Sequence, residues 1–153
     1  MKFVEAFSLH NGDVEWQRRD QYEWLTDVFE APQIMIAAKC TGRIREHVKN
    51  ELTNAGWSYD VRINQAFDLT ITGIFRDMAF QIQTGNISRA PYDLMKLQYL
   101  YTQKKIEVGA IAVPTKKAAS IIGSNIANVD RIWNEAQLFD RIITLPLLIL
   151  SFE

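Results

Sequence analysis

The chain has 153 residues, of which 48% are hydrophobic and 23% are charged, and its formal net charge is −1. This composition is that of an ordinary globular protein with a sizeable core, so it excludes a disordered chain, and the length predicts one domain over residues 1–153. No global positive charge marks a nucleic-acid binder, although basic residues can still gather on one face.

Cysteine usage and the apolar segments predict a reducing, cytoplasmic location. The one cysteine, Cys40, has no partner for an internal disulfide. The first residues lack the apolar stretch of a signal peptide, and the longest apolar run, 142–150, is too short to cross a bilayer. One cysteine and two histidines cannot build a closed zinc site. We therefore expect a cytoplasmic protein without a membrane segment.

Apolar periodicity in the first third of the chain predicts two helices with a strand between them. The first helix is expected over 13–31 and the second over 41–55, each with apolar residues on one face. Thr41 is a suitable N-cap for the second helix, and Gly56 stands where a C-terminal glycine is favoured. The short apolar run 33–38 is a strand candidate between them.

Two alternating segments, 67–73 and 78–83, predict an antiparallel hairpin with 74–77 as its connection. One face, which begins with Phe67, is apolar and is expected to pack on the core. The other face is the most site-like feature of the chain, and its alternative is a hairpin whose solvent side is simply polar. This polar face carries Asp68, Thr70, Thr72, Gln81 and Gln83.

The second half predicts alternating helices and strands. After Pro91 a helix is expected over 92–105, followed by a strand over 106–113 that is apolar on both faces. A loop at 123–125 precedes a helix over 126–140 and a last strand over 142–152. The order of elements predicts an α/β sandwich, in which helices flank a mixed β-sheet.

The segments FDLTITGIFRDMAFQIQTGN, YDLMKLQYLY, VGAIAVP, IGSNIANVDRIWNEAQLF and ITLPLLILSFE follow one another in the second half. In their order and spacing, over about residues 52–153, the chain resembles the BglII/BstYI-like type II restriction endonucleases. The resemblance implies a restriction-endonuclease-like fold of the PD-(D/E)xK kind. It also implies a homodimer that cuts short palindromic sites in double-stranded DNA with Mg²⁺.

The resemblance assigns an active site in which this sequence departs from the family at both acids. In the family an Asp on one strand and a Glu-x-Gln on the next hold Mg²⁺, with a main-chain carbonyl as a further ligand. Here Thr72 falls on the Asp position, Gln81 on the Glu position, Ile82 on the carbonyl and Gln83 on the Gln. Neutral side chains cannot offset the charge of a divalent cation. Asp68, on the strand face of Thr72, is the substitute we consider, as a metal ligand with Gln81 and the Ile82 carbonyl.

The resemblance also implies a DNA-reading loop at 123–125 and the start of the helix that follows. Hydrogen-bonding side chains there can read base edges, and lysines and arginines elsewhere can contact phosphates. The alternatives are a solvated surface charge for each lysine or arginine and a helix cap for Asn125 or Asn128. The candidates for base reading are Ser124, Asn125, Asn128 and Arg131, and those for phosphate contacts are Arg89, Lys96, Lys116 and Lys117.

Three functional hypotheses remain open on the sequence. The first is a DNA-binding protein of restriction-endonuclease fold whose cleavage is weak or lost. The second is an active Mg²⁺-dependent endonuclease that uses Asp68 with Gln81 and Gln83. The third is a non-catalytic interaction subunit of a restriction or defence assembly.

Overall fold

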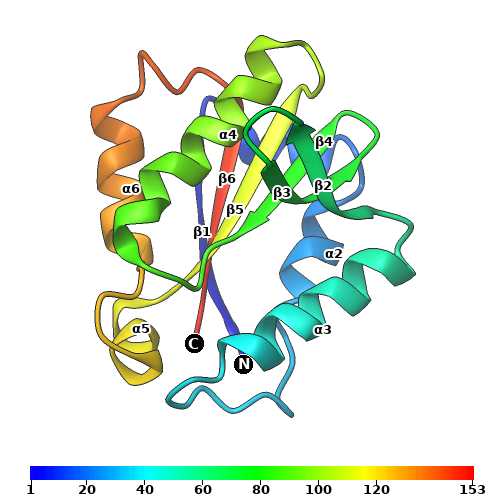
Figure 1. The fold of residues 1–153 in the computed structure, drawn as a ribbon. Helices are drawn as coiled ribbons and strands as arrows, with labels where there is room; N and C mark the ends of the chain where they lie inside the picture. Colours follow the sequence, from blue (N-terminus) through cyan, green and yellow to red (C-terminus); the bar gives the residue numbers. More distant parts are fainter.

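A computed structural model describes all of residues 1–153, which are arranged around one six-stranded mixed sheet (Figure 1). The strand order is β1-β6-β5-β4-β3-β2, with β4, β5 and β6 parallel and the outer pairs antiparallel. The strands are β1 (Phe3–Leu9), β2 (Ser58–Asn64), β3 (Leu69–Phe75), β4 (Met78–Ile82), β5 (Val108–Pro114) and β6 (Leu147–Phe152).

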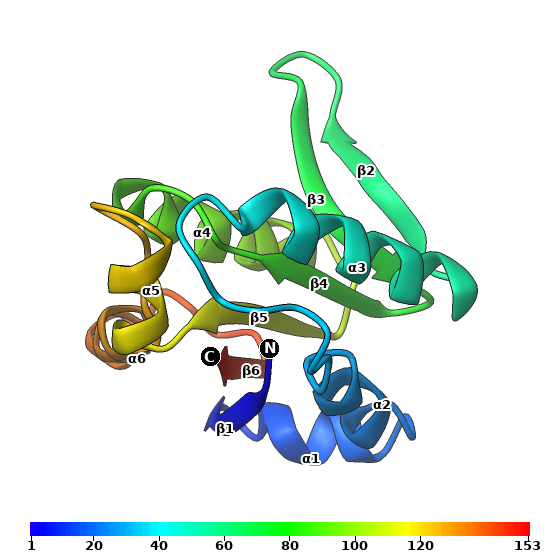
Figure 2. The ribbon, with the colours of Figure 1, turned by 90° about the horizontal axis from the view of Figure 1, so that it is seen from below.

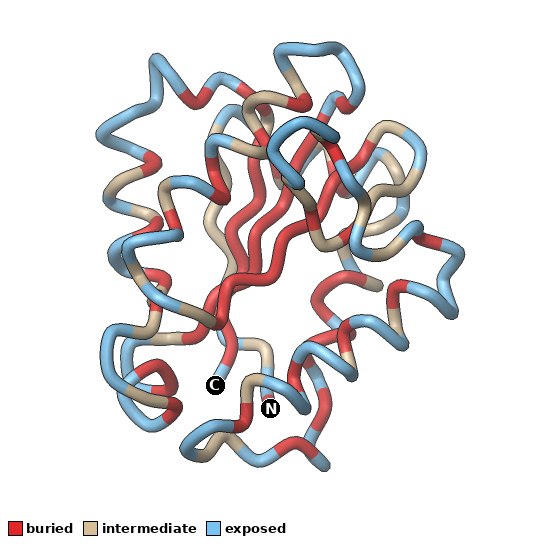
Figure 3. Tube along the Cα trace, in the orientation of Figure 1, coloured by how far each residue is buried: buried red, intermediate tan, exposed pale blue.

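Helices cover both faces of this sheet, which confirms the predicted α/β sandwich. Helices α1 (Gly12–Gln17), α2 (Tyr22–Asp27) and α3 (Thr41–Asn54) pack on one face, and α4 (Ala90–Thr102) and α6 (Val129–Leu138) pack on the other. The 3₁₀ turn η1 (Ile87–Arg89) precedes α4, and α5 (Lys116–Ile122) follows β5. Buried residues concentrate along the central strands (Figure 3).

Alternation along β4 sends its residues to two separate cores. Met78, Phe80 and Ile82 join the core formed with α1, α2 and α3. Ala79 joins the core formed with α4 and α6, and Gln81 points to that same side. The predicted polar face of this strand is therefore covered by a helix rather than open to solvent, because a central strand between two helical layers has no exposed face.

The structure corrects the expected first helix and the expected strand at 33–38. The helix is interrupted between α1 and α2, where Asp20 has a φ of 55°, outside the helical region. The segment 33–38 forms turns and irregular structure instead of a strand. Helix α5 and the outer strands β1 and β2 were not predicted, because edge strands that are partly exposed lack a clean alternation of apolar residues.

The predicted hairpin is present, with shifted boundaries. Phe75 pairs with Met78, so the turn consists of Arg76 and Asp77 alone. Phe67 lies outside β3 and is 79% exposed, so it does not reach the core as expected. The reason is that β2 and β3 continue beyond the body of the molecule as a projecting ribbon, with Phe67 near its tip (Figure 2).

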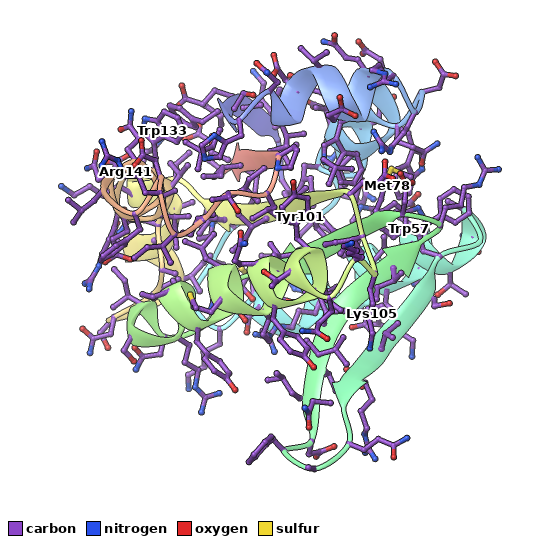
Figure 4. The ribbon with its side chains drawn as sticks, turned by 90° about the horizontal axis from the view of Figure 1, so that it is seen from above. Trp57, Met78, Tyr101, Lys105, Trp133 and Arg141 are labelled. Carbon is purple, nitrogen blue, oxygen red and sulfur yellow. The ribbon has the colours of Figure 1, made fainter.

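The root of this ribbon is held by a stack of aromatic rings. Trp57 stacks on Trp16 at a centroid distance of 6.0 Å, on Trp24 at 5.6 Å and on Phe75 at 5.5 Å. Trp57 and Met78 lie close to one another at the base of the ribbon (Figure 4). Stacked aromatic pairs add to the stabilisation from buried area, so this cluster fixes the angle at which β2 and β3 leave the sheet.

An ion-pair network joins the β3–β4 turn to the segment that follows α1. The Arg19 guanidinium contacts Asp77 at 2.5 Å, Glu15 at 2.6 Å and Glu107 at 2.9 Å. The hydrogen bond from Arg19 holds the pKa of Asp77 below its ordinary value. The turn that sets the register of β3 against β4 is therefore attached to the end of α1, in the helical layer on one face of the sheet.

Helix α1 lies so close to the sheet that only glycine fits at its first residue. A Cβ on Gly12 would stand 2.2 Å from the carbonyl carbon of Leu147, which is backbone and cannot move aside. We predict that Gly12→Ala lowers the free energy of unfolding by about 3 kcal/mol, because the clash must displace a helix or a central strand.

Urea unfolding measures this loss, and Gly42→Ala is the matched control. Nothing lies within 4 Å of a Cβ at Gly42 in α3. The better helix propensity of alanine should leave that variant as stable as the parent or up to about 1 kcal/mol more stable. Equal stabilities of the two variants would contradict the close packing of α1 on β6.

Candidate functional site

Thr72 and Gln81, the two residues expected at the family's acid positions, lie directly opposite one another. The regular β3–β4 pairing ends at Gly73 and Phe80, and the next residues, Thr72 and Gln81, connect through side chains. The main-chain N–H and the hydroxyl of Thr72 both donate to Oε1 of Gln81, each at 3.1 Å. The same hydroxyl accepts from the N–H of Ile82 at 3.1 Å. The side chains thus replace the missing backbone bonds where the strands diverge.

A buried carboxylate, Asp93, lies at the centre of the site. It accepts from Nε2 of Gln81 at 3.0 Å and from Nε2 of Gln83 at 2.5 Å, and Nζ of Lys96 lies 2.5 Å from its Oδ1. Gln81, Gln83 and Asp93 are at most 8% exposed. We refer to five residues, Thr72, Gln81, Gln83, Asp93 and Lys96, as the Asp93 cluster. Burial of a carboxylate is strongly unfavourable unless such donors surround it.

The partners fix the orientation of both glutamine amides. Oε1 of Gln81 faces donors on Thr72, and Oε1 of Gln83 accepts from the N–H of Gly85 at 2.7 Å. Their Nε2 groups must then face Asp93, which as a carboxylate can only accept. Each glutamine therefore bridges a backbone donor and Asp93, and a glutamate in either place would remove the donor and add a second negative charge.

Asp93 and Lys96 both lie near the start of helix α4. Pro91 lies in its first turn, where a proline is favoured, and Asp93 is an acid near its N-terminus. Lys96 follows three residues later on the same face and donates to the carbonyl of Thr70 on β3 at 3.0 Å. One turn of α4 is thereby connected to both strands of the hairpin.

The loop expected to read DNA is joined to the end of β4. Residues Asn86 and Ile126 form a β-bridge, and the N–H of Ile87 donates to the carbonyl of Asn125 at 2.7 Å. Asn125 has a φ of 58°, a left-handed conformation that asparagine tolerates. The exposed Ser124 and Asn125 therefore lie in space beside Asn86 and Ile87, just after the end of β4.

The model of the restriction endonuclease BglII/BglIII family matches residues 4–152 of the chain. This chain belongs to that family. A search of curated protein sequences found no significant match.

Solved structures of BglII show the same fold as this family member. A crystal structure of restriction endonuclease BglII complexed with a DNA 16-mer matches with a TM-score of 0.80 and 14% identity, over 100% of this chain and 78% of that one. The crystal structure of free BglII matches with a TM-score of 0.73 and 14% identity, over 100% of this chain and 80% of that one. No helix of this BglII-family chain has the length and apolarity needed to span a membrane.

The donor set of this BglII-family site does not fit a divalent cation. Thr72 and Gln81, the residues expected at the acid positions, are neutral, and their oxygens are already engaged with each other and with Ile82. The one carboxylate, on Asp93, is paired with Lys96. Nowhere does the chain gather three His, Cys, Asp or Glu residues that could hold a metal ion. Mg²⁺ needs uncompensated, hard oxygen ligands, which this cluster lacks.

The structure does not bring Asp68 into the Asp93 cluster. Asp68 lies in the turn before β3, with a φ of 48° and a side chain that is 78% exposed. Its carboxylate contacts Arg62 on β2 at 2.7 Å. Asp68 lines the same groove as Gln81, but the expected ligand set of Asp68, Gln81 and the Ile82 carbonyl is not assembled, because the left-handed turn takes Asp68 off the strand face.

The groove beside the cluster runs between the projecting ribbon and α4. Arg45 from α3 lies in its wall and donates from Nε to Oγ1 of Thr84 at 3.1 Å. Arg89, an expected phosphate contact, is exposed and also lines the groove. The sequence did not identify Asp93 and Arg45 as site residues, because an acid in the first turn of a helix and an arginine on a helix surface are ordinary features.

Of the other expected DNA-binding residues, Lys96 lies on α4, and the rest lie on α5 and at the start of α6. The side chain of Asn128 caps α6 by accepting from the N–H of Arg131 at 3.3 Å, which is the capping alternative, and the Arg131 side chain pairs with Glu135 at 2.7 Å. Lys116 is exposed and lines a groove with Asn128 and Arg131, whereas Lys117 lies 3.7 Å from Glu153. Lys96 is not a surface charge, since its side chain is 11% exposed.

The hydrogen bonds of the Asp93 cluster predict that a glutamate at position 81 destabilises the protein. Gln81→Glu replaces a donor to Asp93 by a second carboxylate, so the two like charges raise the pKa of the new group. We predict that this variant is less stable than the parent by about 2 kcal/mol at pH 8. A carboxyl whose pKa is raised on folding destabilises the protein above that pKa, so the deficit should shrink as the pH falls toward 5.

Thermal and urea unfolding over pH 5–8 test this prediction, with Gln65→Glu as the control. Gln65 is exposed in the turn before β3, so the same change of charge there should leave stability nearly unaltered. A deficit for Gln81→Glu that does not change with pH would argue against close contact between position 81 and Asp93.

Proposed function

We propose that this chain binds duplex DNA with a BglII-like fold and has weak or no capacity to cleave it. The observation that carries this proposal is the saturated Asp93 cluster. Its acid positions are neutral, its glutamines are engaged, and its one carboxylate is paired with Lys96. Metal-assisted hydrolysis requires an ion to activate water and stabilise the leaving group, and this cluster offers no place to hold one.

DNA binding is supported by features outside the cluster. The family model covers nearly the whole chain, and a BglII structure of the same fold is a complex with DNA. Arg45 and Arg89 line the groove beside the ribbon, and Lys116 and Arg131 line a second groove between α5 and α6. Ser124 and Asn125 remain exposed in the loop between them, so they are the base-reading candidates that we retain.

We also propose that the protein acts as a homodimer. A palindromic site presents two equivalent halves, and a symmetric dimer matches them with two copies of one surface. Helix α4 exposes Tyr92 and Met95, and the end of α6 exposes Leu138 and Phe139. These apolar side chains on the helical layer of α4 and α6 are suited to burial against a second copy.

The first test is an assay of duplex plasmid DNA with Mg²⁺ or Mn²⁺, scored for both retardation and cleavage. We expect retardation without discrete fragments. Discrete metal-dependent cleavage that Asp68→Ala abolishes would instead establish an active endonuclease that uses Asp68 with Gln81 and Gln83. No retardation at moderate salt would leave the interaction subunit as the surviving hypothesis, and sedimentation with and without DNA would then measure assembly.

Charge removal tests where the DNA lies. Arg89→Ala and Lys116→Ala should each weaken binding to all duplexes and reduce the slope of log K against log salt concentration by about 1. Lys105→Ala is the control, because Lys105 is exposed beyond the C-terminal end of α4, far from Arg89 at its start (Figure 4). Equal effects of all three changes would place the DNA elsewhere.

A further inference from the structure

We propose that the ammonium group of Lys96 is a built-in cation of this site, which balances Asp93 in place of a divalent metal ion. We further propose that the site takes a backbone phosphate of DNA without metal. The second statement rests on the proposed DNA binding, whereas the first concerns the protein alone. Both are argued from the contacts of Lys96 and Asp93 in this structure.

The position of Lys96 is that of an internal counter-ion. Its Nζ lies 2.5 Å from Oδ1 of Asp93 and donates to the carbonyl of Thr70 at 3.0 Å, with its side chain 11% exposed and that of Asp93 8% exposed. A buried ion pair persists only when its geometry and extra hydrogen bonds offset desolvation. The two glutamine amides supply those extra bonds to Asp93.

The charges of the cluster exclude a second cation, and the groove around it has an excess of positive charge. Arg45, Arg89 and Lys96 line this groove against the carboxylates of Asp68 and Asp93. Asp93 and Lys96 cancel, and Gln81 and Gln83 are neutral, so nothing is left to attract a divalent ion. Arg45 and Lys96 both line the small polar hollow in front of Thr72 and Gln81, where Asp60 is the one carboxylate. An ammonium has three donors, and its two partners leave one for a ligand in the groove, which Lys96 also lines.

Removal of the ammonium should convert the cluster into a metal site. In Lys96→Met the Asp93 carboxylate is uncompensated, with the Thr70 carbonyl nearby as a further oxygen ligand. We expect Mn²⁺ binding to this variant, without DNA, to be at least about tenfold tighter than to the parent, as measured by the loss of the free-ion electron paramagnetic resonance signal. Lys96→Met/Asp93→Asn should lose this gain, and Lys105→Met should not show it.

Two results would overturn the built-in cation. One is Mn²⁺ bound to the parent protein at a site that Asp93→Asn removes. The other is a folded Lys96→Met variant, verified by circular dichroism, that binds no more Mn²⁺ than the parent. The measurement on the parent and on Asp93→Asn needs no change at Lys96, so it decides the question even where Lys96→Met does not fold.

The phosphate part is tested by DNA retardation in EDTA and in Mg²⁺. We expect the parent to bind equally well in both, within about twofold, and Lys96→Met to bind roughly tenfold more weakly in EDTA and to recover part of this loss in Mg²⁺. DNA binding by the parent that requires Mg²⁺ would overturn the inference while the proposed function stands. No DNA binding in either condition, with the Mn²⁺ results as expected, would overturn the proposed function and leave the built-in cation.

Discussion

The site is organised by one buried carboxylate that has to be neutralised and fully hydrogen-bonded. Asp93 enters the space between α4 and the hairpin, where water does not compensate its charge. Its hydrogen bonds and its opposite charge come from Gln81, Gln83 and Lys96. Gln81 and Lys96 also form hydrogen bonds with the backbone of β3, and Gln83 with the backbone just after β4. Satisfying Asp93 therefore also determines how α4 sits on the two strands.

This constraint gives a physical reason for the neutral side chains of Thr72 and Gln81, the residues expected at acid positions. With Asp93 and Lys96 in place, a glutamate at 81 would face a carboxylate about where Gln81 now donates at 3.0 Å. At the opposite position, the hydroxyl of Thr72 donates to Gln81 and accepts from the N–H of Ile82. These two hydrogen bonds join β3 and β4 where their backbones diverge. The neutral side chains of Thr72 and Gln81 thus agree with the ion pair of Asp93 and Lys96 on α4. In the proposed arrangement, Lys96 provides the positive charge that a metal ion would otherwise provide.

The remainder of the fold fixes the positions of the ribbon and of the loop proposed to read DNA. The aromatic stack on Trp57 sets the direction of the ribbon, and the bridge between Asn86 and Ile126 holds the loop of Ser124 and Asn125 at the end of β4. The aromatic stack lies away from the Asp93 cluster, whereas the bridge is joined to it through Gly85, which donates to Gln83 and accepts from Ala127. The proposed replacement of a metal ion by Lys96 is therefore compatible with the fold that this chain shares with BglII.

The sequence by itself determined the sandwich and the existence of the hairpin, because apolar alternation is a local property. The two-residue turn that sets Thr72 opposite Gln81 was known only from the structure, since the expected connection of 74–77 implies another register. The sequence could not place Asp68, whose direction depends on a left-handed turn, or reveal the break at Asp20 and the edge strands β1 and β2. The tertiary structure alone decided that the glutamines are buried and that Asp93 and Lys96 hold them. These groups are ten or more residues apart from their partners on β3 and β4, and only the packing of α4 on the sheet brings them within hydrogen-bonding distance.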